Sequence, residues 1–108
     1  MSQEVHLTDA AARDLDELYA GAYERGGDVR ATAFLDRIED LMGKLAGGEL
    51  RSTTPPLLEA LGKVAIRQHV AEGLRVLFRP YDQRIAVVLI APVQRSFQSL
   101  LERRVLDG

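Results

Sequence analysis

The chain has 108 residues, no cysteine and a formal net charge of −2. These properties limit the classes of protein to which it can belong. One domain over residues 1–108 is expected at this length, and 46% apolar and 28% charged residues are ordinary for a soluble globular protein. The lack of cysteine excludes disulfide scaffolds, thiol nucleophiles and cysteine-based zinc sites. The sequence has no apolar run of about 18 residues and no signal-peptide pattern, so we expect a cytoplasmic protein without a membrane partner.

Charge is distributed unevenly along the chain. Residues 1–60 carry 12 acidic and 6 basic side chains, whereas residues 61–108 carry 4 acidic and 8 basic ones. Two explanations of this uneven charge are equally good. The first half can form a solvated acidic helix surface, or the second half can form a basic binding surface. The sequence pI of about 5.6 disfavours a general nucleic-acid binder, for which a pI above about 9 is usual.

The sequence pattern in the first half of the chain predicts a short strand and two helices. Residues 3–7 alternate in polarity as a strand does, and Thr8 is typical of the N-cap of a helix over residues 9–25. Gly26-Gly27 is expected to end this helix, and a second helix then runs to Gly47-Gly48. The short loop between the helices implies an antiparallel hairpin. The second helix has the clearest apolar stripe: Ala31, Phe34, Leu35, Ile38, Leu41, Met42 and Leu45.

The second half predicts a connector, three strands and a last helix. Pro55-Pro56 is expected to exclude helix locally in the connector over residues 49–62, where leucines form at most a short turn. From residue 63 the apolar period becomes two, with turns at 71–73 and 82–83. In the first of these strands, one face is expected to carry Val64, Ile66 and Val70, and the other Lys63, Arg67 and His69.

The strand over residues 85–91 is apolar on both faces, which indicates the central strand of the sheet. Ser96 suits the cap of a closing helix, whose apolar face is expected to hold Phe97, Leu100, Leu101 and Val105. The derived order is β-α-α-β-β-β-α. It predicts an α+β fold with a helical hairpin packed on an antiparallel sheet and a C-terminal helix.

Arginines are the main candidates for function. Arg67, Arg75 and Arg79 are expected on exposed faces of adjacent strands, and Arg95 follows the last strand. Guanidinium groups sharing one face suit phosphate or carboxylate ligands. For any single arginine, however, a solvent-facing role or an ion pair within the chain is the more frequent explanation.

His69 is a candidate general base, although an edge-strand histidine without a catalytic role is the favoured alternative. Two histidines are too few for a histidine-based metal cluster. The sequence contains neither a phosphate-binding glycine loop nor a GxSxG elbow, so it supports no cofactor.

Several segments in this order form a distinctive set: VHLTDAAARDLDELYAGAY (5–23), AFLDRIEDLMGKLA (33–46), Leu61-Gly62, Arg67, GLRVLF (73–78), IAVVLIA (85–91) and QSLLERR (98–104). Together they resemble the RelE/ParE superfamily of type II toxins, and most of all its ParE, or plasmid stabilisation, branch. The resemblance spans nearly the whole chain and implies the β-α-α-β-β-β-α fold derived above.

The resemblance implies a toxin that inhibits bacterial growth and is neutralised by a cognate ParD-like antitoxin. ParE-like members look like poisons of DNA gyrase without an evident active site, so this reading assigns no catalytic residue and no cofactor. The expected target-binding residues are Arg67, Arg75, Arg79, Arg95, Arg103 and Arg104. The expected antitoxin-binding residues are Leu77, Val88, Ile90, Tyr19 and Tyr23. A homodimer or a toxin–antitoxin hetero-oligomer is compatible with this interpretation.

Two alternatives stay open. The first is a RelE-like ribosome-dependent mRNA endoribonuclease, with Arg67, Arg75 and Arg95 at the phosphate and His69 as base. Against it, the residues after the last strand where the resemblance calls for an acid or base are Phe97, Gln98 and Leu101. The second is a non-toxic relative that only binds antitoxin, since the junction over residues 91–96 departs from the basic or histidine-containing motif expected in the ParE branch.

Overall fold

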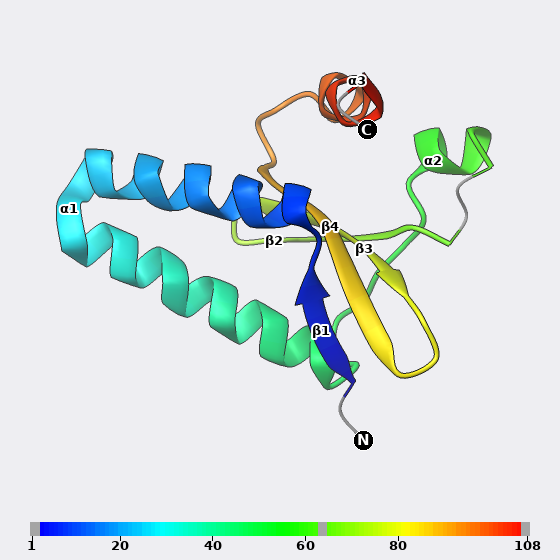
Figure 1. Ribbon diagram of the computed structural model, residues 1–108, viewed down its shortest axis with the longest axis horizontal. Coiled ribbons are helices and arrows are strands. Elements are labelled where there is room, and N and C mark those ends of the chain that lie inside the picture. The colour runs from blue at the N-terminus through cyan, green and yellow to red at the C-terminus, as the bar shows by residue number, and fades with distance from the viewer. Residues whose placement is uncertain (1–2, 63–64, 107–108) are drawn as a thin grey trace.

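The computed structural model of the chain is a mixed α+β structure, as predicted (Figure 1). It describes residues 3–62 and 65–106, without the side chains of Arg103, Val105 and Leu106. The elements in chain order are β1 (Glu4–Leu7), α1 (Asp9–Ala46), α2 (Pro56–Ala60), β2 (Arg67–Ala71), β3 (Leu74–Pro80), β4 (Arg84–Pro92) and α3 (Phe97–Leu106). In the described part of the chain, no helix is long and apolar enough to cross a membrane.

The α1 segment is a helical hairpin rather than one straight helix. Its N-terminal arm, residues 9–26, and its C-terminal arm, residues 28–46, run antiparallel (Figure 1). Gly27 makes the reversal with φ 66° and ψ −155°, a backbone conformation that essentially only glycine adopts. At the start of the hairpin, the Thr8 hydroxyl accepts a hydrogen bond from the Ala11 N–H at 3.2 Å, which confirms the predicted cap.

The four strands form one sheet in the order β1-β4-β3-β2. The pairs β2–β3 and β3–β4 are antiparallel, whereas β1 pairs with β4 in parallel. The prediction that residues 85–91 form the central strand is confirmed, because β4 lies between β1 and β3 and is buried along most of its length. Glu72 and Gly73 join β2 to β3 with φ of 53° and 81°, as a two-residue hairpin turn requires.

The helical hairpin covers one face of the sheet, and buried residues of its apolar stripe pack on the strands to form the main core. Phe34, Ile38 and Leu45 from the C-terminal arm pack with Val76 and Phe78 of β3. Each is at most 7% exposed, so each contributes about 1.5–3 kcal/mol through burial. We call this side of the sheet the hairpin face.

The opposite side of the sheet, which we call the second face, is covered by the two short helices. Leu58 of α2 packs with Leu77 and Leu89, and Phe97 and Leu101 of α3 pack against the same cluster. The helix α2 begins at Pro56, directly after Pro55. The expectation that these prolines exclude helix is therefore wrong at this point, because a proline at the first helical position loses no hydrogen bond.

The first strand of the meander is shorter than predicted. β2 begins at Arg67, and Ile66 precedes it while still packing on the second-face cluster. Val70 does not join a core face as expected, because it lies near the end of an edge strand and is 49% exposed. Lys63 and Val64 lie outside the described residues.

Candidate functional site

Strand register divides the predicted arginine cluster between the two faces of the sheet. Arg67 is paired with Phe78 and His69 with Val76, and both partners belong to the core of the hairpin face. Directly opposed residues of antiparallel strands point to the same side, so Arg67 and His69 also point to that side. Arg75 and Arg79 alternate with these core residues and belong to the second face. The expectation of one shared arginine face is therefore wrong.

Arg67 and His69 are both engaged by the connector that runs beside β2. The Arg67 guanidinium donates to the Ser52 hydroxyl at 2.6 Å and to the Ser52 carbonyl at 2.7 Å. His69 Nδ1 lies 2.8 Å from the Arg51 carbonyl oxygen, which only a protonated Nδ1 can satisfy. These contacts hold residues 51–53 along the edge of the sheet, so both side chains have a structural role here.

Arg75 is held between β2 and α3. It donates to the Gln68 side-chain oxygen at 2.7 Å, and its guanidinium carbon lies 4.8 Å from the centre of the Phe97 ring. Its Nε is buried without a hydrogen-bond partner in the described part of the chain. An unsatisfied buried donor costs about 1–3 kcal/mol of folding free energy. Arg75 therefore holds α3 against the sheet, but its buried Nε lowers the stability of the fold.

Arg104 takes part in a contact that we call the Asp14–Arg104 clamp. Its guanidinium donates to both carboxylate oxygens of Asp14, at 2.8 and 2.9 Å, and to the Val88 carbonyl at 2.8 Å. Asp14 also accepts the Ile90 N–H at 3.1 Å. β1 ends at Leu7, opposite Val87, so these two side chains satisfy backbone groups of β4 beyond the end of its neighbouring strand.

The turn between β3 and β4 carries two exposed arginines around one tyrosine. The guanidinium carbons of Arg79 and Arg84 each lie 5.2 Å from the centre of the Tyr81 ring. Arg95, beyond β4, is also exposed and lines a cavity of about 190 Å³ beside Glu17. Within residues 3–62 and 65–106, the structure gives none of these three arginines an ion pair.

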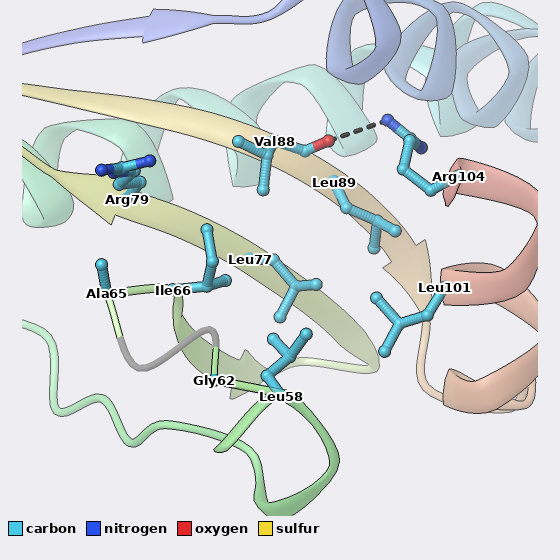
Figure 2. Close-up of a pocket in the computed structure, with 10 residues that line it drawn as sticks. All are labelled: Leu58, Gly62, Ala65, Ile66, Leu77, Arg79, Val88, Leu89, Leu101 and Arg104. Atoms are coloured by element: carbon cyan, nitrogen blue, oxygen red, sulfur yellow. Dashed lines mark hydrogen bonds between the residues drawn. The ribbon is translucent and has the colours of Figure 1, made fainter. Parts of the chain in front are cut away.

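A larger cavity lies on the second face, between α2 and α3 (Figure 2). Its volume is about 460 Å³, which is within the usual range of ligand pockets. Leucine, isoleucine and valine side chains form much of its wall, while Arg79 and Arg104 lie at separate places on its border (Figure 2). We call this cavity the second-face pocket, and it is lined by Leu58, Gly62, Ala65, Ile66, Leu77, Arg79, Val88, Leu89, Leu101 and Arg104.

The residues predicted to bind antitoxin do not form one surface. Leu77 and Val88 line the second-face pocket, whereas Ile90 is 2% exposed and belongs to the core of the hairpin face. An irregularity in the β3–β4 register near Val88 changes the alternation of β4, and the sequence alone does not reveal it. Tyr19 and Tyr23 are exposed on the N-terminal arm of the hairpin.

Among the predicted target-binding residues, Arg79 and Arg95 are exposed, whereas Arg67, Arg75 and Arg104 have partners inside the chain. The side chain of Arg103 lies outside the described residues. Sequence reasoning missed Asp14, which looked like one of many carboxylates on a polar helix face. It also missed Tyr81 and Arg84, for which the only signal was their position beside a turn.

Among the titratable groups of the described residues, the pKa of one, Lys44, is clearly shifted, and this residue lies away from these sites. The hydrogen bond from Lys44 to Asp40, together with the negative charge of that carboxylate, raises the pKa of Lys44. Lys44 is exposed, and the two residues are one turn apart on the C-terminal arm of the hairpin. This ion pair therefore lies on a solvent-exposed helix surface, outside the candidate sites.

Comparisons with known proteins agree with the fold and identify a family. The family model described as "ParE toxin of type II toxin-antitoxin system, parDE" matches residues 5–97. A solved structure of the chromosomal ParDE system from P. aeruginosa aligns with TM-score 0.69 at 18% identity, covering 86% of this chain and 98% of the other. A chain of the RelBE2 toxin–antitoxin complex from Mycobacterium tuberculosis aligns with TM-score 0.53 at 16% identity, covering 85% and 99%. Among curated proteins, no significant match was found.

Proposed function

The chain belongs to the ParE toxin family of type II toxin–antitoxin systems, and from this premise we propose that it arrests bacterial growth by poisoning DNA gyrase and is neutralised by a cognate ParD-like antitoxin. Gyrase is inhibited by binding rather than by a reaction that the toxin catalyses. The antitoxin partner is supported by the toxin–antitoxin systems to which the similar structures belong.

The observation that carries the proposal is the separation of His69 from Arg75 and Arg79. An RNA-cleaving site needs a proton acceptor within reach of the attacking hydroxyl and cations at the same phosphate. Here His69 lies on the hairpin face and donates its Nδ1 proton to a backbone carbonyl, while Arg75 and Arg79 belong to the second face. This arrangement supports a toxin that binds its target and disfavours the ribonuclease set of Arg67, His69, Arg75 and Arg95.

We place the main target contact at Arg95. Its side chain is exposed and forms no ion pair within the described ranges, so a partner can reach it without breaking a contact inside the chain. In contrast, Arg67 and Arg104 support the fold, and replacing them tests stability together with binding. Arg95 therefore offers the cleaner test.

The proposal is tested with purified toxin, DNA gyrase and supercoiled plasmid. Wild-type toxin is expected to cause accumulation of cleaved plasmid, and Arg95→Ala is expected to reduce this about tenfold, because it removes a charged contact. Arg30→Ala, an exposed arginine of the hairpin, is the matched control and should behave as wild type. Wild-type toxin that leaves gyrase cleavage unchanged would overturn the proposal.

Growth of a bacterial host that carries a DNA-damage reporter separates the alternatives. Arrest with reporter induction supports gyrase poisoning. Growth without arrest indicates a relative that only binds antitoxin.

Arrest with a silent reporter would favour RNA cleavage, for which one observation offers a site. Tyr81 lies between Arg79 and Arg84, and a phenol beside two guanidinium groups can transfer a proton at a phosphate. In that outcome, Tyr81→Phe should abolish the arrest.

A further inference from the structure

The turn between β3 and β4 holds two guanidinium groups around one aromatic ring. The guanidinium carbons of Arg79 and Arg84 each lie 5.2 Å from the centre of the Tyr81 ring, so they are at most twice that distance apart. The Tyr81 N–H donates to the Arg84 carbonyl at 2.7 Å, which closes the turn and holds these two residues side by side. Figure 1 shows the turn, in yellow, at the margin of the molecule. A partner can therefore approach both guanidinium groups at once.

Both arginines are free to meet a ligand. Arg79, Tyr81 and Arg84 are exposed, and within residues 3–62 and 65–106 the structure gives neither arginine an ion pair. The planar guanidinium fork is preorganised, and its contact with the ring restricts it further, so little conformational freedom is lost when it binds an anion. Successive phosphates of one DNA strand rise about 3.4 Å along the helix axis, so the pair can contact one phosphate or two neighbouring ones.

Two carboxylates restrict which anions this site can hold. Glu4 is paired with Arg84 in the β1–β4 register, and Asp82 lies in the turn itself. Both line the same groove as the two arginines, which is open and has a volume of about 750 Å³. The groove as a whole is therefore not strongly positive, and it does not enclose a small ion. A ligand must place its negative charge directly against the guanidinium groups and continue beyond the groove, as a phosphodiester chain does.

The position of the turn relative to Arg95 favours duplex DNA as the source of the phosphodiester. Arg95 follows β4, whereas the turn precedes it, and the 9 residues of β4 separate the two by about 30 Å. Gyrase acts on duplex DNA. A toxin that contacts the enzyme through Arg95 can therefore contact the bound DNA through the turn, without competition between the two sites.

We propose that Arg79 and Arg84 bind phosphates of the duplex DNA that gyrase holds, and that Tyr81 keeps the two guanidinium groups in position. This proposal deepens the proposed function and rests on it in naming DNA as the ligand. The toxin then contacts enzyme and DNA together, at opposite ends of β4.

The test uses the full chain, without gyrase, and a fluorescently labelled DNA duplex of about 20 base pairs, or roughly two helical turns. Binding is measured by fluorescence anisotropy at salt concentrations between about 20 and 150 mM, because each phosphate contact adds about −0.9 to the slope of log K against log salt. We expect a slope of about −1.8 for wild type, from two contacts. Single-stranded RNA of the same length should bind more weakly, because its charge density is lower.

Substitutions at the turn locate the binding. Arg79→Ala and Arg84→Ala should each weaken DNA binding about threefold to tenfold at low salt, and each should reduce the magnitude of the slope by about 0.9. Arg30→Ala removes an exposed arginine of the hairpin and is the matched control. Tyr81→Ala should weaken binding, whereas Tyr81→Phe keeps the ring and should bind as wild type does.

Glu4→Gln tests the site in the opposite direction. It removes a negative charge beside Arg84 that repels phosphate, so DNA binding should strengthen about twofold. Glu24→Gln removes the same charge from an exposed position of the hairpin and should leave binding nearly unchanged.

Every outcome of these titrations bears on the proposal. Binding with the expected slope, weakened in both turn variants with circular dichroism unchanged and kept in Arg30→Ala, supports it. Absence of DNA binding by wild type at the lowest salt, equal effects of Arg79→Ala and Arg30→Ala, or tighter binding of RNA than of DNA would each overturn it. Gyrase is absent from this measurement, so a failure here leaves gyrase poisoning through Arg95 intact, and a failure of the gyrase assay leaves this result unchanged.

Discussion

The Asp14–Arg104 clamp joins three parts of the fold that are far apart in sequence, and its removal should be measurable as a loss of stability. Asp14 lies on the N-terminal arm of the hairpin, Arg104 on α3, and their backbone partners Val88 and Ile90 on β4. The two side chains are 20% and 28% exposed, so the ion pair is partly shielded from water. We predict that Asp14→Ala destabilises the protein and weakens the attachment of α3.

The expected size follows from the contacts. Hydrogen bonds to a charged group contribute roughly 1.5–3 kcal/mol, and removing one partner of a fully buried ion pair costs about 3–5 kcal/mol. Because both side chains retain some exposure, Asp14→Ala should cost about 2–3 kcal/mol. Arg104→Ala should cost a similar amount, about 2–3 kcal/mol, since it removes the same ion pair and the bond to the Val88 carbonyl in place of the bond from Ile90.

A double-mutant cycle measured by urea denaturation isolates the pair. The double variant should be less destabilised than the sum of the single variants by about 1 kcal/mol, because the second substitution removes a group that has already lost its partner. Asp16→Ala, an exposed position on the same arm, is the matched control, since it shares the gain in helix propensity. Additivity within about 0.3 kcal/mol, or equal effects of Asp14→Ala and Asp16→Ala, would refute the clamp as a stabilising contact.

Two further pairs of substitutions test the hairpin by thermal unfolding. Gly27→Ala should lower the free energy of unfolding by about 1–3 kcal/mol through backbone strain alone, because its added methyl group meets no atom. At Gly43, in regular helix, an added methyl group also meets no atom, so Gly43→Ala should raise the free energy of unfolding by about 0.5–1 kcal/mol. If both substitutions changed stability in the same direction, backbone strain at Gly27 would not explain the result. Phe34→Ala should cost about 3–5 kcal/mol, whereas Leu35→Ala, at a position 39% exposed, should cost less than half as much; similar losses would mean that the hairpin packs through a different stripe.

Sequence reasoning succeeded where a local signal determines a local structure. Three features depend only on residues that are close together in the sequence: the Thr8 cap, the helical stripe through Phe34 and Ile38, and the alternation in β3. The central position of β4 was also predictable, because only a strand covered on both sides is apolar throughout. Ser96 caps α3 through a bond from the Ser99 N–H at 3.3 Å, as its spacing indicated.

The sites were less predictable because they depend on register between strands. Placing Arg67 opposite Phe78 rather than one residue away decides which face it occupies, and sequence periodicity does not fix that offset. The register irregularity near Val88 also decides which face Ile90 occupies. Ile90 was expected on the antitoxin-binding surface and instead lies in the core. The clamp joins Asp14 to a residue 90 positions away, and no short-range pattern marks such a pair.

These register effects decide which chemistry the second face can perform. Arg75 and Arg104 are occupied in holding α3 to the sheet, so among the arginines of this face Arg79 has the greatest freedom to meet a partner. Arg79 borders an apolar hollow, and the candidate base His69 lies on the opposite face of the sheet, so the two do not meet at one phosphate. The same arginines that suggested phosphate chemistry in the sequence therefore support a binding surface in the folded chain.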